Sequence, residues 1–239
     1  MRSLRSIFTC FTIVFLFGCS HHLEIKNLDD YQASSLHTLP KDFTIGVSTS
    51  NTEKNGKVLV TGLANGLSKY TGSVIYPYYP SSAKSTDLVT NVTVRSDHKG
   101  SGWNFLINFP GFLIWAPAWN GYVYRPNYEV DIELLRGSDL SKLDTFSVPI
   151  NLNVRHAEMD RTWTEISWFE VGTIALVGGI VFTEYDADVT PLLEREIKIP
   201  IGDYLAQEIA NRITSTDIIG RIKTGKIAGA ELAPTEAPH

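Results

Sequence analysis

The sequence contains very little cysteine. Of its 239 residues only Cys10 and Cys19 carry a thiol, and both lie near the N-terminus. Residues 20–239 therefore have no thiol for a disulfide, a thiolate metal site or a cysteine nucleophile. A disulfide framework and a cysteine-dependent enzyme are both excluded for this part of the chain.

Basic residues are also scarce. Lys and Arg total 21 against 26 Asp and Glu, which gives a formal net charge of −5. A surface that binds nucleic acid needs a clustered excess of Lys and Arg, so this balance argues against such a partner. The chain is 43% hydrophobic and 20% charged, which is typical of a globular protein and too polar for a protein with many membrane spans.

The first eighteen residues have the pattern of a secretory signal peptide. Arg2 and Arg5 form a basic start, and residues 7–17 follow as an apolar run. Eleven residues are too few to span a bilayer, so we predict that residues 1–18 are removed. The mature chain would then hold 19 basic and 26 acidic residues, a net charge of −7. It would have no cationic patch for anionic lipid.

Residues 16–19, Leu-Phe-Gly-Cys, resemble the lipobox of bacterial lipoproteins. Leu16 stands three positions before the cysteine and Gly18 directly before it. The resemblance implies cleavage between Gly18 and Cys19 and acyl chains, such as palmitate, on Cys19. Each buried CH₂ group contributes about 0.8 kcal/mol, so two or three chains hold a protein on a membrane durably. The alternative is an ordinary signal peptide with an incidental cysteine.

Ser20, rather than Asp, follows Cys19. In lipoproteins of Gram-negative bacteria this resemblance implies sorting to the outer membrane, with the protein facing the periplasm. We predict a lipidated Cys19 and flexible tether over residues 19–40, a single domain over 41–219, and a disordered tail over 220–239.

The predicted domain is of the α+β class. A strand at 43–47, a helix at 56–70 and a strand at 73–79 form an N-terminal strand–helix–strand unit. Apolar and polar residues alternate at 88–94, 128–134 and 146–154, which predicts strands with one wet face and a mostly antiparallel sheet. A turn at 136–139 would join the last two strands as a hairpin.

The last third of the chain is predicted to be helical, with helices on one face of the sheet. Thr162 and Glu165 match a capping box before an apolar stretch that ends near residue 182. A hairpin around Gly178 and Gly179 is the alternative for that stretch. A second helix is indicated by apolar residues at helical spacing: Ile201, Tyr204, Leu205, Ile209 and Ile213.

This order of elements, over residues 43–214, is similar to that of the periplasmic domain of the curli-secretion lipoprotein and of the N-terminal domain of the translocation protein TolB. The likeness is one of topology. It implies the same α+β class and carries no site residue across.

Few residues form a pattern that indicates chemistry. His156, Glu158 and Asp160 would share one face of a continuing strand, as an acid–base group would; the alternative is a solvated strand end. Asp186 and Asp188 could bind Ca²⁺, but capping of a helix start fits them better. Small residues at 62–66 lie inside a predicted helix and favour close packing over nucleotide binding. We predict no metal site and no cofactor.

Aromatic residues are concentrated in one uncharged segment. Residues 100–124 have no formal charge, and residues 103–124 contain eight of the 22 aromatic residues that follow the predicted signal. Pro110 and Pro117 argue against a spanning helix there. The segment either packs in the core or forms a surface for lipid or a protein partner. Candidate contact residues are Trp103, Phe112, Trp115, Trp119 and Tyr122.

These observations favour a non-catalytic lipoprotein of the cell envelope that binds a protein partner, within an assembly or secretion system. One alternative is a carrier or sensor of an apolar ligand, with the aromatic segment as its pocket lining. A second alternative is a hydrolase that uses His156, Glu158 and Asp160.

The lipobox predicts the outcome of a single substitution. Cys19→Ala should abolish incorporation of labelled palmitate and leave the uncleaved precursor, because the acceptor thiol is gone. Metabolic labelling followed by electrophoresis measures both. The hypothesis is wrong if wild type takes up no palmitate and the variant is processed identically.

Overall fold

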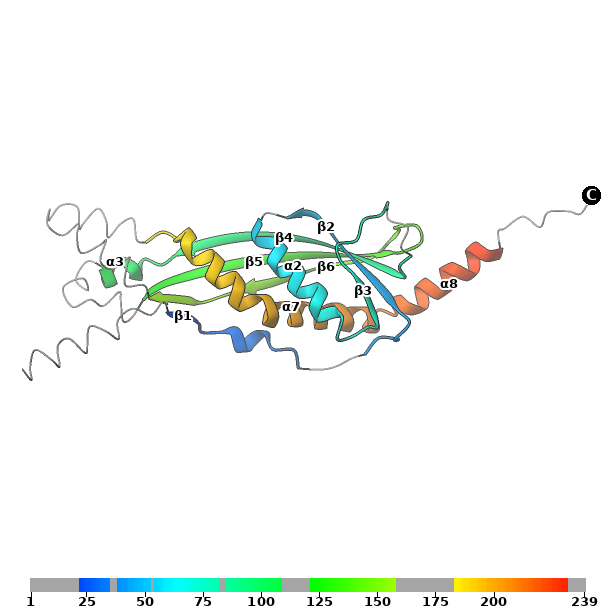
Figure 1. Ribbon diagram of the computed structural model, residues 1–239, viewed down its shortest axis with the longest axis horizontal. Coiled ribbons are helices and arrows are strands. Elements are labelled where there is room, and N and C mark those ends of the chain that lie inside the picture. The colour runs from blue at the N-terminus through cyan, green and yellow to red at the C-terminus, as the bar shows by residue number, and fades with distance from the viewer. Residues whose placement is uncertain are drawn as a thin grey trace, which may run out of the picture. The chain divides into compact units, whose positions relative to one another are not determined.

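The computed structural model describes residues 22–34, 38–52, 54–81, 85–108, 121–157 and 183–231 (Figure 1). The predicted signal, Cys19, and the helix or hairpin predicted between 162 and 182 lie outside these ranges. None of the described helices is both long enough and apolar enough to span a bilayer.

The chain divides into two compact units, each built from three stretches of sequence. Unit 1 comprises Met1–Leu28, Asp97–Asn127 and Asn151–Leu193, and unit 2 comprises Asp29–Ser96, Tyr128–Ile150 and Glu194–His239. Two strands contribute residues to both units, β4 (Leu88–Gly100) and β5 (Tyr122–Arg136).

Seven strands form one mixed sheet in the order β1-β7-β5-β4-β2-β3, and β6 also pairs with β5. The described helices and this sheet confirm the α+β class. The remaining strands are β1 (His22–Ile25), β2 (Thr44–Thr52), β3 (Ser73–Ile75), β6 (Lys142–Asn151) and β7 (Val154–Ala157).

The predicted strand–helix–strand unit is confirmed within unit 2. β2 is followed by α2 (Lys54–Leu67) and by β3, which lies parallel to β2 with Thr44 opposite Ser73. β2 also pairs in parallel with β4, where Ile45 lies opposite Leu88. Parallel neighbours need a crossover connection, and α2 supplies one between β2 and β3.

The predicted alternation is confirmed on the other strands of unit 2. Side chains at every second position of β5 are buried from Tyr128 to Leu134, and on β6 the buried Val148 and Ile150 alternate with exposed neighbours. β5 and β6 are joined by the predicted turn, in which the Arg136 amide donates to the Ser141 carbonyl at 2.9 Å. Pro149 is exposed on β6.

Helices α2 and α7 (Thr190–Ser215) cross at glycines, as close packing by the small residues at 62–66 predicts (Figure 1). A methyl group added at Gly62 would overlap the Lys198 carbonyl oxygen, and one added at Gly202 would overlap the backbone of Gly62. Beside the crossing, Lys69 Nζ and Asp203 Oδ2 form an ion pair at 2.6 Å. The two backbones approach closely because neither helix has a side chain at the contact.

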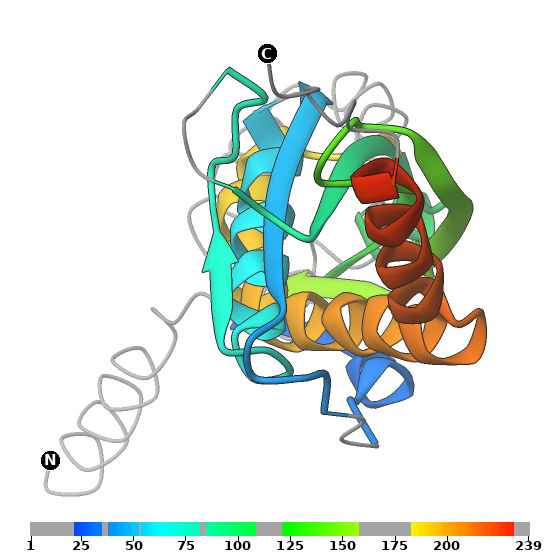
Figure 2. The same cartoon turned by 90° about the vertical axis from the view of Figure 1, so that its right-hand side faces the viewer.

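The C-terminal helices extend beyond their predicted limits. α7 contains the predicted apolar positions and continues on the N-terminal side of Pro200, which lies inside it. The predicted disordered tail from Gly220 is wrong for residues 220–231, because α8 (Ile218–Glu231) occupies them and takes a new direction after α7 (Figure 2). Ile218 and Ile222, one helical turn apart, are buried and hold the start of α8.

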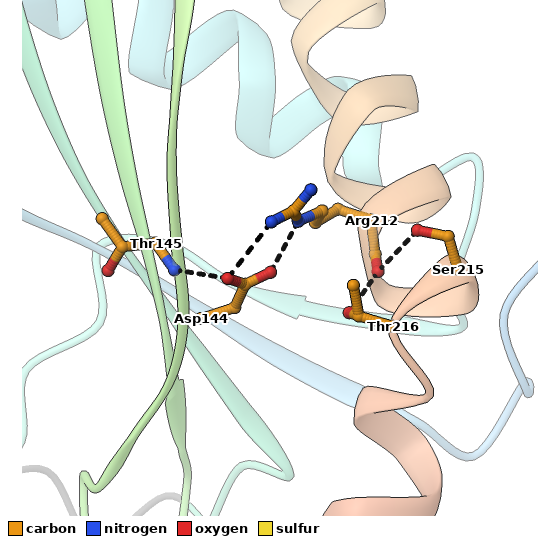
Figure 3. Close-up of polar contacts among 5 residues, drawn as sticks. All are labelled: Asp144, Thr145, Arg212, Ser215 and Thr216. Carbon is orange, nitrogen blue, oxygen red and sulfur yellow. Dashed lines mark hydrogen bonds and ion pairs between the residues drawn. The ribbon is translucent and has the colours of Figure 1, made fainter.

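An ion pair joins β6 to the last turns of α7 (Figure 3). Arg212 Nε donates to Asp144 Oδ2 at 2.6 Å, and the Arg212 guanidinium lies 5.5 Å from the centre of the Phe146 ring. The hydrogen bond from Arg212 lowers the pKa of Asp144 below its usual 3.8. A lowered pKa means that the folded state favours the carboxylate. The pair therefore stabilises the fold at pH values above the usual pKa of an aspartate. Its contribution is lost as the pH falls through the lowered pKa of Asp144.

The prediction of a flexible tether over 19–40 is wrong for its first described residues. β1 pairs antiparallel with β7, with His22 opposite Ala157 and Ile25 opposite Val154. The Asn27 side chain then donates to the Asn151 carbonyl at 2.8 Å and accepts from the Asn153 amide at 2.9 Å. These hydrogen bonds fix the chain to the sheet three residues after Cys19.

The helix crossing predicts the effect of one added methyl group. Gly62→Ala and Gly202→Ala should each destabilise the protein by about 1–3 kcal/mol, because the methyl group meets backbone atoms that cannot move aside. This occurs although alanine is favoured over glycine in a helix by about 1 kcal/mol. Chemical denaturation measures the change.

Gly102→Ala is the matched control. No heavy atom lies within 4 Å of a Cβ built there, so its free energy of unfolding should change by less than about 0.5 kcal/mol. Equal effects at positions 62 and 102 would contradict the packing argument.

Candidate functional site

The candidate site is a cluster of tyrosines and histidines on the strands of unit 1. β5 and β7 pair antiparallel there, with Tyr122 opposite His156 and Tyr124 opposite Val154. Residues directly opposite each other project to the same face, and so do residues two apart on a strand. The side chains of Tyr122, Tyr124 and His156 therefore share one face, where all three are almost completely buried.

Two further rings complete this cluster. The His98 ring, near the end of β4, stacks on the Tyr185 ring with centroids 4.6 Å apart and planes at 18°. The Tyr124 and Tyr185 rings pack edge to face, with centroids 5.2 Å apart and planes at 71°. The Tyr185 hydroxyl lies 3.1 Å from the Thr190 hydroxyl. We name His98, Tyr122, Tyr124, His156 and Tyr185 the tyrosine–histidine cluster.

Backbone contacts hold the segments of this cluster together. Gly121 adopts a φ of +71°, and a side chain there would meet the backbone of His156. A side chain at Gly100 would overlap the Thr183 carbonyl, so the segment carrying Tyr185 runs directly over the end of β4. Both positions require glycine because a neighbouring backbone occupies the space of a Cβ atom.

Asn104 fixes the short helix α3 (Trp103–Asn108) to β5. Its Nδ2 donates to the Val123 carbonyl at 3.0 Å, and its Oδ1 accepts from the Val123 amide at 2.8 Å. The Asn104 side chain is fully buried, whereas Trp103 beside it is 63% exposed. One residue of α3 thus attaches the helix to the sheet, and its neighbour faces solvent.

The five predicted contact residues have different positions. Trp103 is exposed, as a contact residue should be. Tyr122 is not available for contact: it is fully buried, because it belongs to the apolar face of β5. Phe112, Trp115 and Trp119 lie outside the described residues, as do Gly18 and Cys19, so their roles remain predictions.

The predicted acid–base group is only partly described. His156 lies in β7 and is 1% exposed, so the alternative of a solvated strand end is wrong for this residue. It is buried because it faces Tyr122 across the strand pair. Glu158 and Asp160 lie outside the described residues, and the hydrolase hypothesis remains a prediction.

Asp186 acts at a helix start, as predicted in preference to Ca²⁺ binding. Its side chain accepts a hydrogen bond from the Asp188 amide at 3.0 Å, before a short 3-10 helix (Ala187–Val189) that leads into α7. Over the described ranges, no three His, Cys, Asp or Glu side chains converge as metal ligands.

A ladder of charged side chains covers the polar face of β4, β5 and β6 in unit 2. Arg95 pairs with Glu129 at 3.0 Å and with Asp131 at 2.8 Å. Glu133 accepts from Lys142 at 2.8 Å and from Asn91 at 3.2 Å, and these hydrogen bonds lower the pKa of Glu133. The ladder is largely exposed, and each of its carboxylates is paired with a basic side chain.

His98, Asn104 and Tyr185 are site residues that the sequence did not indicate. His98 and Tyr185 are separated by 87 positions, and no spacing rule joins them. For Asn104 the sequence gives a weak indication of a structural role, because this polar residue lies inside the aromatic segment and directly precedes Phe105. Such a residue in an apolar environment needs hydrogen-bond partners.

No family model matches the chain, and no curated protein matches it. Among solved structures, rare lipoprotein B from Shewanella oneidensis aligns at 12% identity over 73% of this chain and 98% of that one, with a TM-score of 0.36. The PelC dodecamer of Paraburkholderia phytofirmans aligns at 11% identity over 77% of this chain and 99% of that one, with a TM-score of 0.28. Likenesses of this strength carry no argument about fold or function.

The attachment of α3 predicts a contrast between adjacent residues. Asn104→Ala should cost roughly 2–4 kcal/mol, because it leaves the amide and carbonyl of Val123 without their partners. Trp103→Ala should change the free energy of unfolding by less than about 0.5 kcal/mol, because its side chain is exposed. Denaturation curves of the two variants test this, and a larger loss at position 103 would contradict it.

Proposed function

We propose that this chain is a lipoprotein of the bacterial cell envelope, anchored through Cys19, that binds a protein partner without catalysis. The observation that carries the proposal is the order of a basic start, a short apolar run and Leu-Phe-Gly-Cys at residues 16–19. We place the protein on the outer membrane, facing the periplasm, on the strength of Ser20.

Partner binding is supported by the uncharged aromatic segment. Trp and Tyr are enriched at protein interfaces, and charged residues are depleted at interface cores. Residues 100–124 have this composition. Tyr122 and Tyr124 at its end are buried in β5, so the contact surface is confined to the residues before them.

The experiment compares partner capture with stability. Full-length protein, with Trp115→Ala or Trp119→Ala, would be cross-linked in intact cells and purified from detergent-solubilised membranes. A partner bound through this segment should be captured by wild type and lost from these variants, while their melting temperature stays unchanged. Mass spectrometry identifies and quantifies the captured protein.

Tyr79→Ala is the matched control, because Tyr79 is an exposed aromatic side chain of unit 2 that lies outside the aromatic segment. It should keep the partner. A fall in the melting temperature of the Trp115 and Trp119 variants would instead assign those residues to the core. Variants that melt normally and still capture the same partner would overturn the proposed surface.

A further inference from the structure

The end of unit 1 that carries Trp103 is the end from which the predicted lipid anchor departs. β1 begins at His22, which lies opposite Ala157 at the end of β7. β7 in turn pairs with the beginning of β5, where Tyr122 lies opposite His156. The start of β1, the end of β7 and the start of β5 therefore meet at one end of the strands.

Trp103 belongs to that same end. It follows the end of β4 at Gly100 by three residues, and its neighbour Asn104 is hydrogen-bonded to Val123, the second residue of β5. In Figure 1, α3 and β1 both lie toward the left-hand end of the strands. Neighbouring strands lie about 4.8 Å apart, so β1 and β5, with β7 between them, are separated by about 10 Å.

The distance between the lipid and this end is limited by the chain. His22 is three positions after Cys19, and a fully extended chain covers at most about 3.6 Å per residue. The start of β1 can therefore lie no farther than about 11 Å from the lipidated residue. A polar headgroup region is several ångströms thick, so the end of unit 1 is kept at the membrane surface.

The exposed side chains suit the interface of the bilayer. Trp103 is a large apolar side chain that is exposed on unit 1, and tryptophan is favoured at the level of the lipid headgroups. Residues 100–124 carry no charge. Basic and acidic residues are mixed in the described parts of unit 1, including Lys26, Glu24, Lys99 and Asp97. The proposed contact of this end with the bilayer therefore does not depend on attraction to anionic lipid.

We propose that Trp103 inserts into the interface of the membrane that holds Cys19, so that unit 1 contacts the bilayer by this end. This inference rests on the proposed lipid anchor. It goes beyond the anchor because it assigns a second contact and thereby a fixed orientation of unit 1.

Site-specific labelling can test this contact, since lipid would occupy the only cysteine left after cleavage. Trp103→Cys then introduces a unique free thiol for an environment-sensitive NBD fluorophore. Asn153→Cys is the matched control: it is an exposed position of the same unit, opposite Lys26 at the other end of β1. Lys26 lies about 13 Å from His22 along the strand direction. Both variants would be purified as lipidated protein, checked for an unchanged melting temperature, and reconstituted into phosphatidylcholine vesicles with brominated acyl chains.

The label at 103 should show blue-shifted emission and loss of intensity through bromine quenching, and the label at 153 should show neither. The result should be the same when anionic lipid is included. If Cys19 carries lipid by mass spectrometry and the two labels behave alike, the membrane contact is overturned and the anchor stands. If Cys19 carries no lipid, the anchor itself fails, and the contact with it. A label at 103 that is shielded in native membranes but not in protein-free vesicles assigns Trp103 to a protein partner, which also overturns the proposal.

Discussion

The buried face of β5 is the feature on which both units depend. The strand has fifteen residues and pairs with β4, β6 and β7. Its alternate side chains are buried from Tyr122 and Tyr124 in unit 1 to Ile132 and Leu134 in unit 2. A shift of one residue in its pairing would turn this whole row toward solvent, so the register of the strand is strongly determined. In unit 1 the same register brings Tyr122 opposite His156 and fixes Val123 where Asn104 can bind it.

Patterns within a single segment were sufficient to predict most of the sheet. The alternation at 128–134 and the strand–helix–strand order at 43–79 both reflect burial of one face, and the apolar periodicity within each segment indicates that face. Two wrong predictions concern segments that lack a clear apolar periodicity. β1 has four residues, and only its pairing with β7, far along the chain, makes it a strand. Small residues and proline over 220–239 predict a tail, although Ile218 and Ile222 have helical spacing and are buried in α8.

The candidate site was less predictable than the fold. Its location in the aromatic segment could be anticipated in part, but the burial of Tyr122 and exposure of Trp103 depend on where β5 begins and how α3 is attached. For His156 the sequence left two alternatives, an acid–base group and a solvated strand end, and neither indicates a buried side chain beside a tyrosine. The cross-strand tyrosine that covers it is 34 positions away. Spacing rules describe one element at a time and cannot show such pairs.

The pairing of β1 also has a consequence for the order in which the fold is completed. His22 pairs with Ala157, 135 residues later, so β1, the first of the described strands, lacks this partner until most of the chain has been synthesised. Closing so long a loop is entropically costly, and contacts of this kind form late in folding. β4, β5 and β7 can assemble before β1 arrives at the edge. Docking of β1 thus becomes a closing step, and an early segment of the chain supplies an edge of the sheet that is completed late.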